Sequence, residues 1–136
     1  MFDYLRYKTM EHGDFATVIN CMDGRVQIQV IEWIKKHHPV QHVDVITEPG
    51  PDRILAEKQN IAQLESIRYR VDISITKHHS KLIVVTGHYD CAGNPVEKDQ
   101  HIMHILEALK TIDSWNYAVP AIGLWIDESW SVCTLY

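Results

Sequence analysis

Two short groups of residues in this sequence carry side chains that could do chemistry. Cys21, Asp23 and Arg25 follow one apolar stretch, and His88 and Cys91 follow another. Two thiolates and one imidazole suit zinc, which prefers four tetrahedral nitrogen and sulfur ligands. Three protein ligands leave the fourth position for water or a carboxylate, as in a catalytic zinc site. The sequence therefore predicts one zinc ion bound by Cys21, His88 and Cys91.

The cysteines also allow other interpretations. A single buried cysteine is often only a small apolar side chain, and Cys21 with Cys91 could form a redox dithiol. The redox hypothesis ranks below zinc because the chain lacks the Cys-x-x-Cys motif typical of such proteins. Cys133 lies in the last predicted strand, away from both groups, and we expect it to be buried packing. Three cysteines in total fit poorly with a disulfide framework.

Asp23 and Arg25 lie two residues apart, directly after a predicted ligand. The planar guanidinium of arginine suits a carboxylate, so we expect a charge-assisted pair. One interpretation is a surface salt bridge of little energetic worth. The other is a functional pair, in which Asp23 accepts a hydrogen bond from metal-bound water while Arg25 keeps the carboxylate ionised and oriented. We favour the second and treat both as candidate catalytic residues.

Two further histidines lie three residues apart on one predicted helix. His101 and His104 could chelate a second metal at this spacing. We interpret them instead as residues of a solvated helix face or a helix end, like the adjacent pairs His37-His38 and His78-His79.

The elements that must position these residues begin with strands. Apolar runs rich in β-branched residues predict five of them, at residues 15–21, 42–47, 81–87, 118–126 and 130–135. The nearly continuous apolar run at 81–87 indicates burial on both faces, as in a parallel sheet. The last two runs, joined by a tight turn, predict a closing hairpin.

Helices are expected between the strands. Apolar residues at helical spacing predict them at residues 25–38, 61–77 and 102–112, with Pro95 as a first helical residue of the last. Residues 48–51 carry a strong loop signal. The pattern predicts an α/β fold, with a mostly parallel central β-sheet flanked by helices and a C-terminal antiparallel hairpin. Ligands of such sheets bind beyond the carboxyl ends of the strands, where both groups of candidate residues lie.

Length and charge narrow the class of protein. The 136 residues predict a single zinc domain, 1–136, with residues 1–14 as an N-terminal arm. A net charge of −5 without a cluster of Lys and Arg argues against a nucleic-acid partner and a polybasic membrane anchor. No apolar run nears the roughly 20 residues that span a bilayer, and the N-terminus lacks the apolar core of a signal peptide. The expected location is the cytoplasm.

The paired motifs resemble those of the β-class carbonic anhydrases, which have Cys-x-Asp-x-Arg after the first strand and His-x-x-Cys after a later one. This chain has Cys21-Met22-Asp23-Gly24-Arg25 and His88-Tyr89-Asp90-Cys91. The similarity runs from about Phe15 to the C-terminus, and these motifs are specific.

The resemblance implies a zinc lyase. Cys21, His88 and Cys91 would be the zinc ligands, and Asp23 and Arg25 the catalytic dyad. The reaction would be hydration of carbon dioxide to bicarbonate by a zinc-bound hydroxide. In some members of the family the residue matching Asp23 binds zinc itself and displaces the water. The resemblance also implies a homodimer or higher homo-oligomer, because sites of this family are commonly completed across a dimer interface.

Two segments depart from the family pattern. Residues 47–52, Thr-Glu-Pro-Gly-Pro-Asp, stand where the family usually has Arg-Asn-Ala-Gly-Asn, and Asp90 stands where it usually has glycine. Two alternative functions therefore stay open. One is a non-catalytic zinc-binding domain, and the other is a hydrolase of a related small electrophile such as carbon disulfide or carbonyl sulfide.

Overall fold

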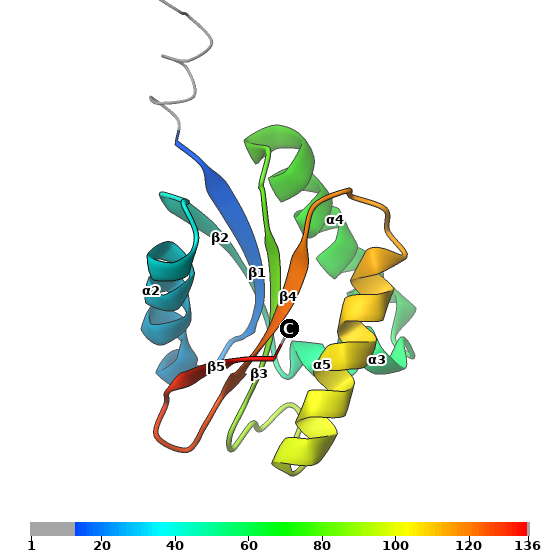
Figure 1. Cartoon of the computed structure of the whole chain (residues 1–136). Coiled ribbons are helices and arrows are strands. Elements are labelled where there is room, and N and C mark those ends of the chain that lie inside the picture. The colour runs from blue at the N-terminus through cyan, green and yellow to red at the C-terminus, as the bar shows by residue number, and fades with distance from the viewer. Residues whose placement is uncertain (1–12, 136) are drawn as a thin grey trace, which may run out of the picture.

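A single five-stranded sheet forms the centre of the molecule (Figure 1). The computed structural model describes residues 13–135, so the arm predicted for residues 1–14 lies almost entirely outside the described residues. The sheet has the order β2-β1-β3-β4-β5. Its strands are β1 (Phe15–Cys21), β2 (His42–Glu48), β3 (Ile83–His88), β4 (Ala121–Ile126) and β5 (Val132–Thr134). The first four are parallel and β5 is antiparallel to β4, which confirms the predicted fold class.

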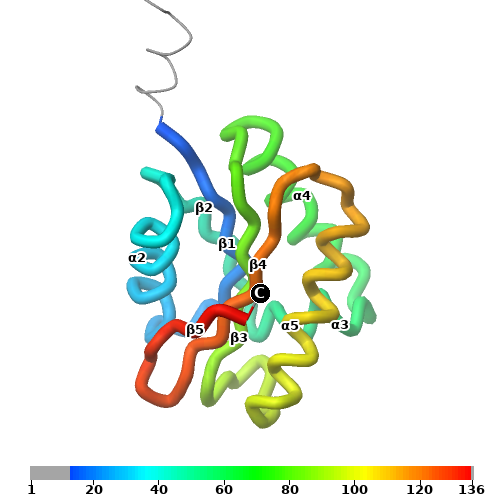
Figure 2. Tube along the Cα trace, in the orientation of Figure 1, coloured from blue at the N-terminus to red at the C-terminus, as the bar shows by residue number. Residues whose placement is uncertain are grey.

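Helices cover both faces of this sheet. They are α2 (Gln27–His37), α3 (Pro51–Glu57), α4 (Ile61–His78) and α5 (Lys98–Asp113), with a short 3-10 helix, η1 (Gly24–Val26), before α2. Figures 1 and 2 show α2 on one side of the sheet and α3, α4 and α5 on the other. Two separate buried clusters follow from this arrangement, one around Ile34 and Val84 and the other around Ile67 and Val85. Within residues 13–135 no helix is long and apolar enough to cross a membrane.

The elements differ from the sequence prediction by more than two residues in three places. The loop predicted at residues 48–51 is shorter than expected, because β2 ends at Glu48 and a helix that was not predicted, α3, begins at Pro51. The fixed φ of proline suits the first turn of a helix. α5 begins at Lys98 rather than Pro95, since the buried side chain of Asn94 holds the preceding segment in place. β4 begins only at Ala121 because Ala118 has a φ of 57° and Pro120 has no N–H to donate.

The strand register brings the two candidate motifs to one edge of the sheet. β1 and β3 are neighbours and run parallel, with Val18 opposite Val84. Cys21 ends β1 and His88 ends β3, so both residues lie at the carboxyl edge of the sheet. Cys91 follows three residues later, on the turn after β3.

At the same edge, two glycines pack backbone against backbone. A Cβ added to Gly93 would overlap the carbonyl carbon of Pro49, and one added to Gly50 would lie 2.7 Å from the carbonyl carbon of Gly93. Gly50 also has a φ of 65°, a conformation that favours glycine. The loop after β2 and the segment after Cys91 are therefore in direct contact.

We expect Gly93→Ala to lower the free energy of unfolding by about 1–3 kcal/mol, because the added methyl group forces two backbones apart. Gly24→Ala is the matched control, since a Cβ there meets no atom within 4 Å. Urea unfolding of the metal-free variants measures the difference. Equal stability of the two variants would contradict the close packing of this edge.

Candidate metal centre

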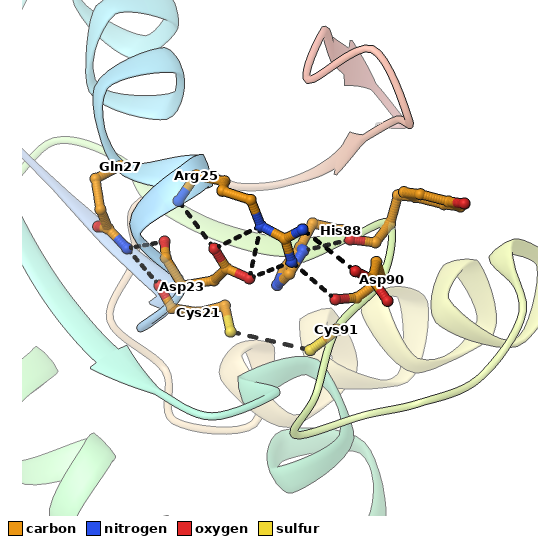
Figure 3. Close-up of polar contacts among 8 residues, drawn as sticks. Cys21, Asp23, Arg25, Gln27, His88, Asp90 and Cys91 are labelled. Carbon is orange, nitrogen blue, oxygen red and sulfur yellow. Dashed lines mark hydrogen bonds and ion pairs between the residues drawn. The ribbon is translucent and has the colours of Figure 1, made fainter.

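The three predicted ligands lie together. One ligand atom from each of Cys21, His88 and Cys91 lies within 4.8 Å of the others, and all three residues are buried. The two sulfur atoms are 3.9 Å apart, and both cysteines are free thiols (Figure 3). No other group of three such residues in the described part of the chain comes as close together.

The ring of His88 is oriented so that one of its nitrogens is free for a metal. Nδ1 donates a hydrogen bond to the carbonyl oxygen of Tyr89 at 2.8 Å, because a carbonyl can only accept. This bond leaves the lone pair on Nε2, which is buried and has no hydrogen-bond partner. A buried polar atom without a partner is destabilising, whereas a metal-bound histidine typically donates its other N–H in this way. The donor set therefore fits a zinc ion.

The two thiols differ in their affinity for a proton. A hydrogen bond from Cys91 lowers the pKa of the Cys21 thiol to about 4, although burial opposes the shift, and the neighbouring His88 side chain and the backbone N–H of Gly50 lower it further. The same hydrogen bond and burial raise the pKa of the Cys91 thiol, while the backbone N–H of Asn94 works in the opposite direction. The pair then consists of one thiolate, Cys21, and one thiol, Cys91, whose proton is released when a metal cation binds.

Asp23 and Arg25 form the predicted ion pair. Arg25 Nε donates to Asp23 Oδ1 at 3.0 Å and Nη2 donates to Oδ2 at 2.7 Å, while the Arg25 backbone N–H donates to Oδ1 at 2.9 Å. These bonds lower the pKa of the Asp23 carboxyl to about 2. The carboxylate is therefore ionised at neutral pH, and with a side chain 20% exposed it is accessible beside Cys21.

Two residues that the sequence analysis did not assign to the site also hold Arg25. Its Nη1 donates to Asp90 Oδ2 at 3.2 Å and its Nη2 donates to the Asp90 carbonyl at 3.1 Å (Figure 3). The guanidinium carbon lies 4.4 Å from the centre of the Trp130 ring, a cation–π contact from the turn between β4 and β5. The departure from the family pattern at Asp90 was a signal for the first contact, whereas nothing local indicated Trp130.

Gln27, at the start of α2, fixes the backbone of the first motif. Its Nε2 donates to the carbonyl oxygens of Cys21 at 2.7 Å and Asp23 at 2.8 Å. Figure 3 shows this side chain on the side of the turn away from Cys91. Because both accepting carbonyls belong to site residues, Gln27 sets the turn that presents the cysteine and the carboxylate.

Three predictions about residues outside the metal centre are wrong. Cys133 is exposed rather than buried, because β5 is a short edge strand. His101 and His104 do not lie on a solvated helix face. Both are buried where α5 packs against α3, and they bond to Asp52 and Asn94.

A parallel α/β sheet with this order, carrying two cysteines and a histidine at its carboxyl edge, is the architecture of a β-carbonic-anhydrase-like protein. Residues 11–136 match the family described as "Putative carbonic anhydrase", and the chain belongs to that family. No curated protein matches the sequence.

Solved structures show the same fold. The β-carbonic anhydrase CcaA is similar with a TM-score of 0.62 and 15% identity, over 95% of this chain and 77% of that one. CafA, a β-carbonic anhydrase of the fungal pathogen Aspergillus fumigatus, has a TM-score of 0.57 and 14% identity, over 97% and 85%. One of two tetrameric β-carbonic anhydrases from the ascomycete Sordaria macrospora has a TM-score of 0.57 and 14% identity, over 97% and 91%.

Proposed function

We propose that this chain binds one zinc ion through Cys21, His88 and Cys91 and hydrates carbon dioxide to bicarbonate, with Asp23 and Arg25 as catalytic residues. The observation that carries this proposal is the buried Nε2 of His88, which has no partner and belongs to a cluster with two sulfurs. Membership of the carbonic anhydrase family supports the reaction.

The residues of this chain have separate parts in the proposed reaction. When bound, zinc supplies a Lewis acid that lets water ionise near neutral pH, so that a nucleophile for carbon dioxide is available. Asp23 accepts a hydrogen bond from the attacking oxygen, because an ionised carboxylate can only accept. This bond turns the lone pair of that oxygen toward the carbon of the substrate. Arg25 keeps Asp23 ionised, and Asp90 and Trp130 keep Arg25 in place.

Stopped-flow measurement of carbon dioxide hydration by the zinc-loaded chain tests the proposal. We expect a rate that rises with zinc content and is lost on chelation. One zinc per chain with no acceleration would contradict an enzyme and favour the non-catalytic zinc-binding domain. Turnover of carbon disulfide or carbonyl sulfide without turnover of carbon dioxide would overturn the substrate.

The remaining parts of the proposal concern the whole protein. We propose that residues 1–136 act as a single zinc domain in the cytoplasm and assemble as a homodimer or larger homo-oligomer. The relative from Sordaria macrospora is described as tetrameric, which supports assembly. Met22 and Tyr89 are large apolar side chains that are exposed beside the candidate site, and a second copy could cover them. The free thiols agree with a reducing compartment.

A further inference from the structure

A buried polar cluster lies behind the candidate metal centre. It consists of Asp52 from α3, Asn94 from the segment after Cys91, and His101 and His104 from α5, and we call it the Asp52 cluster. The side chains of Asp52 and His101 are each 1% exposed, and Asn94 is fully buried. None of these four residues belongs to the two motifs that carry the predicted zinc ligands.

The carboxylate of Asp52 is the centre of this cluster. His101 Nδ1 donates to Asp52 Oδ2 at 2.7 Å, and Asn94 Nδ2 donates to the same oxygen at 3.1 Å. Asn94 Nδ2 also lies 2.9 Å from His104 Nδ1, which accepts from it. Apolar side chains of similar volume commonly hold two helices together at least as well as a buried charged group does. The Asp52 cluster therefore calls for a role besides joining α3 to α5.

The Asp52 cluster touches the backbone that carries two of the predicted ligands. A Cβ added to Gly87, the residue before His88, would lie 2.9 Å from Asp52 Oδ2 and 3.3 Å from His101 Nδ1. The Asp52–His101 pair thus packs directly against the end of β3. Asn94 lies three residues beyond Cys91, and its bond to Asp52 connects the turn that carries this cysteine to α3.

Asp52 also restrains the loop on the Cys21 side of the centre. It follows Gly50 by two residues, and the Gly50 backbone packs against Gly93. Through its hydrogen bond with Asn94, one carboxylate joins the loop after β2 to the segment after Cys91. These two segments lie beside the predicted ligands, because Gly50 follows β2, the neighbour of β1, and Gly93 follows Cys91 by two residues.

We propose that Asp52, Asn94 and His101 are positioning residues of the metal centre, which hold the loop after β2 and the turn after β3 in the arrangement where the three ligand atoms converge. Groups of this kind, outside the ligands themselves, typically change metal affinity by about 10–100-fold when removed. This inference rests on the proposed zinc site and is independent of whether that site catalyses a reaction.

Zinc affinity of the full chain, measured by competition with a chromophoric chelator, tests the proposal. We expect Asp52→Asn and Asn94→Ala to weaken zinc binding by about 10–100-fold. Asn94→Ala is informative because it removes the side-chain bonds and keeps the backbone N–H. We also expect both variants to alter the visible absorption bands of bound Co2+, which report ligand geometry and would not respond to a loss of stability alone.

Asp44→Asn is the matched control. Asp44 Oδ2 accepts a bond from His78 Nδ1 at 2.6 Å, so the chain has a second aspartate–histidine pair, between β2 and α4 and away from the metal centre. We expect zinc affinity within about twofold of wild type for this variant, since distant sites act independently.

The outcomes separate this inference from the proposed function. A wild-type chain that binds no zinc contradicts the metal centre itself. A wild-type chain that binds zinc, with unchanged affinity and unchanged Co2+ spectra in Asp52→Asn and Asn94→Ala, overturns the positioning role alone. If Asp52→Asn does not fold, Asn94→Ala decides the question. If neither folds while Asp44→Asn does, the Asp52 cluster serves the fold and the positioning role is rejected.

Discussion

Replacing His88 with alanine is expected to leave the chain without zinc at concentrations where wild type holds one ion per chain. The variant loses the Nε2 atom that is buried without a partner beside the two sulfurs. Apparent binding free energies of four-ligand zinc sites are about 10–16 kcal/mol, so one ligand is worth roughly 3 kcal/mol and affinity should fall a hundredfold or more. Elemental analysis after dialysis, together with chelator competition, measures the loss.

Cys133→Ser is the control for this experiment. It removes a thiol that is exposed on β5, and we expect it to keep the full zinc content. Cys21→Ser and Cys91→Ser should behave like His88→Ala, because each removes one of the clustered ligand atoms. Full zinc content in His88→Ala, or loss of zinc in Cys133→Ser, would mean that the ion is bound elsewhere.

Replacing Asp23 with asparagine is expected to lower the rate of carbon dioxide hydration by about a hundredfold, within the range found for groups that accept or donate a proton in a reaction. Asparagine has nearly the same shape but presents an N–H donor and carries no charge for Arg25 to pair with. Zinc content should stay at one per chain. The pair of measurements, stopped-flow rate and zinc content on the same sample, separates catalysis from ligation.

Asp90→Asn is the matched control, because it replaces the other carboxylate that bonds to the guanidinium of Arg25 with an amide. Its carboxylate is 69% exposed and bonds to Arg25 from the side away from Asp23, so we expect a smaller loss, below about tenfold. Equal losses in the two variants would assign the effect to the position of Arg25 rather than to Asp23. Loss of zinc in Asp23→Asn would instead identify Asp23 as a ligand.

The sequence predicts the metal centre well because its parts are local. Each ligand motif directly follows an apolar run, and parallel strands end at one edge, so the spatial meeting of Cys21 and His88 follows from fold class. The pair of Asp23 and Arg25 is equally local, since the residues are two apart. The beginning of α3 was missed because Pro49, Gly50 and Pro51 carry a turn signal that is stronger than the short helix after them.

The buried histidines could not be predicted in the same way. His101 and Asp52 are 49 residues apart, and each depends on the other for a partner in the core. A histidine on a helix looks solvated until the element packed against it is known, because its burial depends on a hydrogen bond from outside the helix. The contact between Trp130 and Arg25 has the same origin, since it depends on where the turn between β4 and β5 folds back.

The strand pairing at the carboxyl edge of the sheet has a consequence for metal exchange. Cys21 is paired with Glu48 of the edge strand β2, whereas His88 is paired with Ile126 of the inner strand β4. Because fraying of a sheet begins at its edge strands, we expect hydrogen exchange to be slower around His88 than around Cys21. Cys91 lies on a turn outside the sheet. It is the predicted ligand that can move without breaking a strand pairing, so we expect release of a bound ion to begin at Cys91.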